Sequence, residues 1–290
     1  MATSDDVKAL LEKVPDLDKR DAKIPLLRTR PSDGKLTGPT WGDAEEIVKG
    51  IFGHGRQGVA AVIDLVTEVD DGKDYRARYM LHVLATYTCR KGKDEQQGMV
   101  VDAILSKLTG EATEKQAFLV HQLQVCAGRD AAGRLGKLLA SERLCEPAAL
   151  ALVAIGGSAA EQFRAALPRA RGPARRTIVQ ALAVLGDEAS LRTLRGAMED
   201  GDADVRLSAA WGLANLGDGA STDMLLRAAD GAKDWQRAQM TKACLILAEK
   251  LLAAGRKAEA RKIYTHLRDT RGGQAESYIR QAAAKALKAM

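Results

Sequence analysis

The feature that most constrains this chain is a helix-sized pattern that returns about every 31 residues. The best-formed copy covers residues 202–218, DADVRLSAAWGLANLGD. Asp202 or Asp204 can cap the start of a helix, because a carboxylate accepts hydrogen bonds from its free backbone N–H groups. Apolar residues then follow at spacings of four, four and three, which places them on one helical face: Val205, Ala209, Leu213 and Leu216. Gly217 ends the helix, since glycine readily adopts the left-handed conformation of a helix C-terminus.

Related stretches precede and follow this copy, and a second helix is predicted after this copy and after each of the earlier ones. The related stretches begin at residues 74, 116, 146, 174 and 234. The second helices are expected at 96–108, 131–140, 159–167, 188–198 and 221–229. A single helix pair cannot bury its apolar face, so we expect consecutive pairs to stack into a continuous core. Aromatic residues make up only 4% of the chain against 46% apolar residues, which favours helices over strands.

The pattern Asp-x-Asp-Val-Arg-x-x-Ala-Ala-x-x-Leu-x-x-Leu-Gly in residues 202–217 resembles the inner helix of the short HEAT-like repeat, which also occurs in phycobilisome lyases. The resemblance extends over about residues 74–250. It implies an all-α fold, a right-handed α-α superhelix of the HEAT-like or armadillo type. In that family the arginine of the motif tends to form a ladder between repeats, and the helices that carry it line the concave face. The matching residues here are Arg76, Arg175, Arg206 and Arg237. For these we favour pairing between repeats over ligand contact.

These patterns divide the chain into four predicted parts. Residues 1–40 form an irregular arm with one short helix, and residues 41–73 form an N-terminal capping helix pair that is broken at Gly53-His54-Gly55. Residues 74–250 form the solenoid. Residues 251–290 form C-terminal capping helices that begin like a tetratricopeptide unit, with Gly255 at the turn.

Charge is distributed unevenly along the chain. The net charge is +6, but residues 1–75 hold 11 Lys/Arg against 15 Asp/Glu, and residues 233–290 hold 13 against 5. A basic surface attracts acidic proteins or nucleic acids, although solubility alone also explains it. No apolar run reaches the roughly 20 residues that span a bilayer, and the N-terminus lacks a secretory signal pattern. We therefore expect a cytoplasmic protein that does not bind membranes.

Catalytic and metal-binding patterns are absent from the sequence. No two of the His and Cys residues lie three or four positions apart, and no C-x-x-C occurs, which disfavours a metal site. The four isolated cysteines are expected to be free, buried thiols. Neither a Gly-x-Ser-x-Gly elbow nor a phosphate-binding loop is present. The expectation is that the chain has no cofactor and is not an enzyme.

A partner-binding surface is the remaining candidate site. When the inner helices are superposed at the repeat offset, one row of positions faces away from the core. The row and the position beside it supply six candidate contacts on the concave face: His82, His121, Arg176, Gln180, Trp211 and Lys242. Tryptophan and arginine often dominate the energetics of interfaces. Trp211 could instead pack between adjacent repeats.

Three functions are compatible with these features. The first is a scaffold or adaptor that binds an acidic protein or peptide on its concave surface. The second is nucleic-acid binding through the basic C-terminal half, with base excision like that of the HEAT-like alkylpurine DNA glycosylases as one form. Only three aromatic residues lie in the basic segment, and no catalytic Asp can be placed, which weakens this hypothesis. The third, attachment of a tetrapyrrole to a protein, rests on the repeat resemblance alone.

Overall fold

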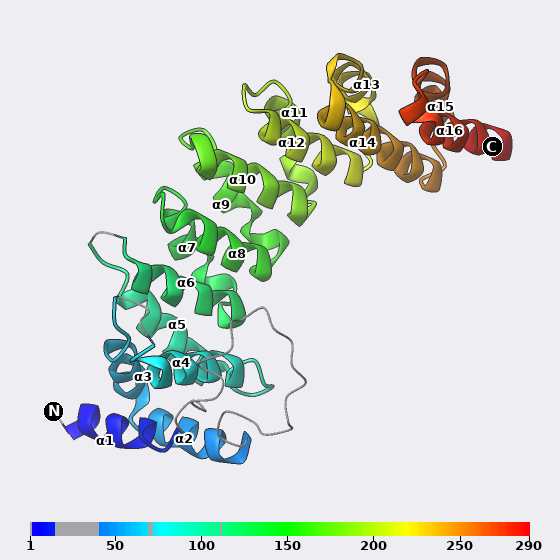
Figure 1. Ribbon diagram of the computed structural model, residues 1–290. Coiled ribbons are helices and arrows are strands. Elements are labelled where there is room, and N and C mark those ends of the chain that lie inside the picture. Colours follow the sequence, from blue (N-terminus) through cyan, green and yellow to red (C-terminus); the bar gives the residue numbers. More distant parts are fainter. Residues whose placement is uncertain (1, 15–40, 69–71, 111) are drawn as a thin grey trace. The chain divides into compact units, whose positions relative to one another are not determined.

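The structure is a computed structural model that describes residues 2–14, 41–68, 72–110 and 112–290. Within these ranges all regular elements are helices, and no strand occurs (Figure 1). The predicted all-α class is therefore confirmed. No helix in the described part of the chain is both long enough and apolar enough to cross a membrane.

The described residues group into two compact units, residues 1–134 and 135–290. The boundary lies within α7 (Ala132–Leu138) and inside the segment predicted to be one solenoid. The division into an arm, two caps and a solenoid stays a prediction, and residues 15–40 of the predicted arm lie outside the described ranges.

The 1–134 unit consists of helices that pack on their sequence neighbours. They are α1 (Ala2–Leu11), α2 (Trp41–Gly53), α3 (Gly55–Asp64), α4 (Tyr75–Tyr87), α5 (Asp94–Ser106) and α6 (Glu114–Cys126). Helices α2 and α3 are separated at His54, where Gly55 has a φ of 60°. This is the predicted break. Helix α1 packs against α2 and α3 and buries Val7 and Leu11, so it extends the predicted N-terminal helix pair.

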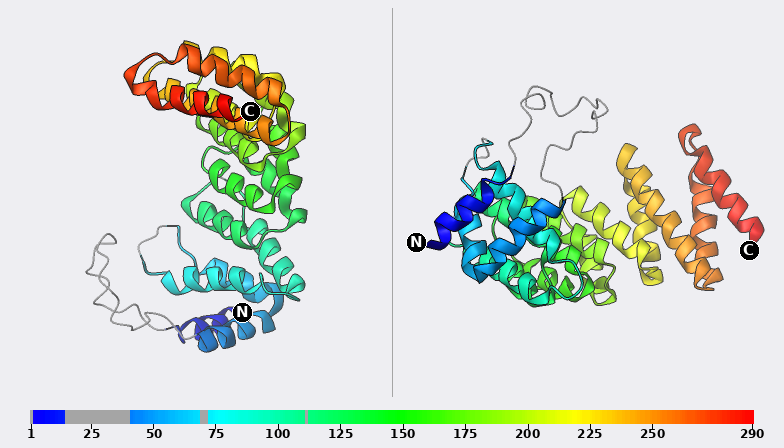
Figure 2. Two further views of the ribbon diagram at one scale, coloured as in Figure 1. Left: turned by 90° about the vertical axis from the view of Figure 1, so that its right-hand side faces the viewer. Right: turned by 90° about the horizontal axis from the view of Figure 1, so that it is seen from below.

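The 135–290 unit stacks helix pairs in two layers (Figure 1). One layer contains α8 (Cys145–Ile155), α10 (Gly172–Leu185), α12 (Ala203–Asn215) and α14 (Asp234–Ala253). The other contains the shorter helices α9 (Ala160–Ala166), α11 (Leu191–Ala197) and α13 (Thr222–Gly231). Helices α15 (Lys257–Thr270) and α16 (Ser277–Ala289) follow α14 at the C-terminal end (Figure 2).

Local sequence signals set the ends of these helices. The Asp202 carboxylate accepts a hydrogen bond from the backbone N–H of Asp204 at 2.8 Å, which caps α12 as predicted. Gly186 and Gly217 follow α10 and α12 with φ values of 60° and 67°, a conformation that L side chains rarely adopt. Gly255, with φ 75°, forms the predicted turn between α14 and α15.

The core of the 135–290 unit is built from Ala and Leu, with few aromatic side chains. Leu152, Leu182 and Leu213 are fully buried at corresponding positions of α8, α10 and α12. Between them, small alanines let successive helices of this layer approach closely. The opposite face of the same helices is exposed, and it carries the candidate site.

Candidate binding groove

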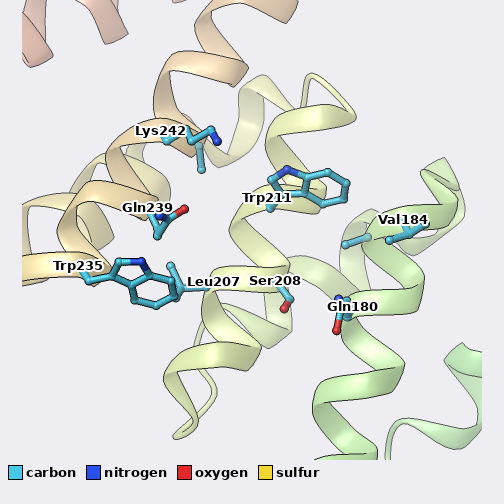
Figure 3. Close-up of a pocket in the computed structure, with 10 residues that line it drawn as sticks. Gln180, Val184, Leu207, Ser208, Trp211, Trp235, Gln239 and Lys242 are labelled. Carbon is cyan, nitrogen blue, oxygen red and sulfur yellow. The ribbon is translucent and has the colours of Figure 1, made fainter. Parts of the chain in front are cut away.

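Helices α10, α12 and α14 together line a cavity of about 340 Å³ in the 135–290 unit (Figure 3). Each helix contributes residues spaced three or four positions apart, so one face of each helix forms the wall. We refer to this cavity, with Trp211 and Trp235 on its walls, as the tryptophan groove.

Large apolar side chains of the tryptophan groove are unusually exposed. Trp211 on α12 is 43% exposed, Trp235 on α14 is 61% exposed, and Val184 on α10 is 51% exposed. Figure 3 shows the Trp235 indole beside Leu207 and the Trp211 indole between Lys242 and Val184. A cluster of exposed apolar groups on three adjacent helices is typical of an interaction site.

The polar residues of the groove are neutral or positively charged. Gln180, Ser208 and Gln239 offer amide and hydroxyl groups, and Lys242 contributes an ammonium group. No carboxylate lines the cavity. The groove therefore favours a ligand with hydrogen-bonding groups and a negative charge over a cationic one.

The groove depends on a close approach of α10 and α12. A Cβ atom built on Gly212 would lie 2.8 Å from the Cβ of Ala183 and 3.1 Å from Cδ1 of Leu194. Contacts this short do not occur between ordinary side chains, so only glycine at 212 permits this separation of the helices. Ala183 also lines the groove, so the same contact sets the spacing of the groove walls.

The structure places three of the six predicted partner-binding residues together in the tryptophan groove: Gln180, Trp211 and Lys242. Arg176 lies on the same face of α10, one turn before Gln180, but it does not line the cavity. Its guanidinium lies 3.2 Å from the carboxylate of Asp204 and 3.4 Å from that of Asp202, at the start of α12. Arg176 thus has a partner between repeats within the protein.

The other two predicted contacts lie in the 1–134 unit. His82 on α4 and His121 on α6 are both exposed. Nδ1 of His82 lies 3.0 Å from the side-chain oxygen of Gln122, which links α4 to α6. A binding role for the two histidines stays a prediction.

Sequence reasoning did not assign Trp235, Val184 and Gln239 to the site. Their spacing contained the necessary signal. Trp235, Gln239 and Lys242 occupy positions i, i+4 and i+7 of α14, and Val184 follows Gln180 by four on α10. Trp235 lies before the best-matched part of its repeat, so superposing the repeats placed only Lys242 of these three α14 residues at the position of Trp211.

The four arginines of the repeat motif contact backbone at the end of an earlier helix or the segment after it. Arg175 donates to the carbonyl oxygen of Leu167 at 3.2 Å, and Arg206 donates to that of Asp200 at 2.7 Å. Arg237 donates to that of Asp230 at 3.2 Å. Arg76 donates to the carbonyl of Val14, also just after a helix, at 2.9 Å. Each arginine therefore ties its own helix to the end of a helix that precedes it in the chain.

A second set of ion pairs, which the sequence analysis missed, links the shorter helices. Arg195 on α11 donates two hydrogen bonds to Asp218 in the turn after α12, at 2.7 and 2.6 Å, and the Ser221 hydroxyl also donates to Asp218. One repeat earlier, Arg164 donates to Asp187 and, at 3.1 Å, to Ser190. Leu-Gly-Asp-x-x-Ser occurs in both turns and was the available signal.

The described residues contain no group of three or more His, Cys, Asp or Glu side chains able to hold a metal ion. All four cysteines are free, and three are buried as expected, whereas Cys89 is exposed. Burial raises the pKa of Cys126 and Cys244 to about 12 and that of Cys145 to about 11. At neutral pH these three thiols are therefore in the protonated form, which is the weaker nucleophile.

A model of the HEAT-repeat family matches residues 160–245, which include all three helices of the tryptophan groove in whole or in part. The chain carries HEAT repeats. This match confirms the predicted resemblance to HEAT-like repeats, and the all-helical structure agrees with the predicted α-α superhelix. No curated protein sequence matches this one.

Among solved structures, the chain is similar to human deoxyhypusine hydroxylase in complex with glycerol. The two share 15% sequence identity, the match covers 100% of this chain and 98% of the other, and the TM-score is 0.33. The prediction that the chain is not an enzyme is contradicted by this comparison, because deoxyhypusine hydroxylase is an enzyme. The absence of a recognisable catalytic pattern from the sequence did not justify that prediction. A likeness this distant assigns no activity to the present chain.

Proposed function

We propose that the tryptophan groove binds an acidic segment of a protein or peptide partner, so that the HEAT repeats act as an interaction scaffold. The observation that carries the proposal is the pair of exposed indoles, Trp211 and Trp235, on adjacent helices. Tryptophan buries a large area at little entropic cost and is enriched among the residues that dominate interface energetics. Lys242, with no carboxylate in the lining, supports an acidic partner. The four free thiols support a reducing, cytoplasmic location.

Nucleic-acid binding through the basic C-terminal segment is the alternative. Several of its cations are engaged by carboxylates of the protein, including Arg237 by Glu276, Arg271 by Asp230 and Lys262 by Asp223. Each such pair removes a cation that could otherwise neutralise a phosphate. This observation favours the peptide proposal over the alternative.

The proposal is tested by replacing Trp211 and Lys242 with alanine together and measuring capture of the partner from native lysate. Removal of an interface anchor weakens the binding free energy by about 2 kcal/mol or more, so we expect an affinity loss of roughly thirtyfold or more. Tyr278→Ala is the matched control, because Tyr278 is 61% exposed on α16 and lies outside the groove.

Nuclease treatment and salt separate the two functions. Binding of a peptide partner survives nuclease treatment, whereas binding of a nucleic acid is lost. For duplex DNA, the logarithm of the binding constant should also fall with the logarithm of the salt concentration, with a slope of about −0.9 per phosphate neutralised. Capture that is equally strong in the double variant and in Tyr278→Ala contradicts the proposed site.

A further inference from the structure

The arginine of the best-matched repeat, Arg206, lacks the carboxylate ion pair that Arg175 and Arg237 have, although the Asp200 carboxylate, already paired with Arg175, is near enough to interact with it electrostatically. Nε of Arg175 donates to the Asp200 carboxylate at 2.5 Å, and Nε of Arg237 donates to that of Glu276 at 2.6 Å. Arg206 lies between these two in the series. Its Nη1 donates to backbone carbonyls, but no carboxylate among the described residues forms an ion pair with it.

The missing carboxylate has a structural cause. Asp200, the partner of Arg175, follows α11, and the acidic residue at the corresponding end of α13 is Asp230. The Asp230 carboxylate is held by Nη1 of Arg271 at 2.7 Å and by Nε2 of His266 at 2.8 Å. Arg271 is fully buried, so this interaction fixes Asp230 toward the C-terminal helices and away from Arg206.

A cavity of about 370 Å³ lies beside Arg206. Arg206 lines it, and so does Arg227, an exposed residue with no ion pair among the described residues. Three of the seven methionines of the chain line the cavity: Met224 is half-buried, and Met198 and Met240 are 5% and 4% exposed. Unbranched thioether side chains adapt to the shape of an apolar ligand. Glu199 is the one carboxylate of the lining, so the two arginines leave the cavity with a positive balance.

We propose that this methionine cavity binds a carboxylate carried on a short apolar chain. The carboxylate completes the arginine series at Arg206, as Asp200 does at Arg175 and Glu276 at Arg237. Arg227 contributes a second charge, and the apolar chain lies on the three methionines. A free alkyl acid and a peptide with Glu beside an apolar residue both provide this chemistry. The site is separate from the tryptophan groove, although Leu207 lines both cavities.

The test uses the full chain with ¹³C-labelled methionine methyl groups, titrated by NMR with three probes: sodium octanoate, octanol, and acetyl-Leu-Glu-Leu-amide. We expect octanoate or the peptide to shift the methyl signals of Met198, Met224 and Met240 saturably. Octanol has the same chain without the charge and should bind at least tenfold more weakly than octanoate. Met80 and Met99 belong to the 1–134 unit and serve as internal controls. Saturation by one probe and not the other identifies the source of the carboxylate.

Variants connect binding to the arginines. Arg206→Gln and Arg227→Gln should each weaken binding of the active probe at least fivefold, and the exposed position of Arg227 keeps that variant folded even if Arg206→Gln is not. Tyr278→Ala, an exposed position that lines neither cavity, should leave the affinity unchanged. The inference is overturned if neither octanoate nor the peptide gives saturable shifts, if octanol binds as tightly as octanoate, or if Arg227→Gln binds like the unmodified chain.

Discussion

Gly212 shows how a single residue determines the groove. In an exposed helix, replacing glycine with alanine stabilises a protein by up to about 1 kcal/mol. At position 212 the added methyl group would lie 2.8 Å from the Cβ of Ala183, and overpacking of this kind costs about 1–3 kcal/mol. We therefore expect Gly212→Ala to lower the unfolding free energy by about 1 kcal/mol, measured by urea denaturation.

Gly196 on α11 provides the matched control for this prediction. A Cβ atom there meets no other atom within 4 Å, and the residue lies inside a helix. Gly196→Ala should raise the unfolding free energy by about 0.5–1 kcal/mol. If the two variants are equally stable, the close contact of α10 and α12 does not constrain the fold.

At the residue scale, repeat positions carried part of the information on which side chains lie together, whereas contacts between neighbouring helices were not readable from the sequence. Gln180, Trp211 and Lys242 share one position of the repeat, and the structure brings them together. Arg176 was assigned to the partner by its place beside this row. Its pairing with Asp202 and Asp204 depends on the distance between α10 and α12, which periodicity does not contain.

At the scale of helices, the boundaries followed from local signals. The helix predicted over residues 202–218 is observed as Ala203–Asn215, and the break at Gly53-His54-Gly55 occurs as predicted. Several shorter helices begin with a turn of 3-10 helix, as at Glu188–Ser190 before α11. The predicted start at residue 188 merged the two, because α11 continues from the 3-10 turn without an intervening residue.

The turn between α12 and α13 is held by Asp218, which should make the stability of the fold depend on pH. Burial alone would raise the pKa of Asp218, but hydrogen bonds from Arg195 and Ser221 hold it below its usual value. A carboxyl group with a lowered pKa in the folded state stabilises the protein at neutral pH. This stabilisation is lost as pH falls from the unfolded value of about 3.9 through the folded pKa.

Asp218→Asn should therefore lower the unfolding free energy at pH 7 by about 2 kcal/mol, because it removes charge-assisted hydrogen bonds from a buried group. Its stability should also decrease less than that of the unmodified protein between pH 5 and pH 3, measured by chemical denaturation at each pH. Glu161→Gln, at an exposed position of α9, controls for the loss of one negative charge. A pH dependence identical in Asp218→Asn and the unmodified protein would refute this account.

For the whole molecule, the sequence was sufficient to predict the all-α repeat fold but not the function. HEAT repeats are recognisable because each repeat must present the same apolar face to its neighbours. The outward surface is free of this requirement, so its function does not follow from the repeat pattern. The contradicted prediction on catalysis has the same origin, since it was drawn from the repeat architecture and from absent motifs.

The central claim, that the tryptophan groove receives a partner, is tested most directly by site-specific photo-crosslinking. The photoreactive residue p-benzoylphenylalanine is placed at Trp211, at Trp235 or at the control position Tyr278, and each protein is irradiated in native lysate after nuclease treatment. The account predicts one common protein adduct from positions 211 and 235 and none of that adduct from position 278. An adduct that forms equally at all three positions, or only at Tyr278, contradicts the claim.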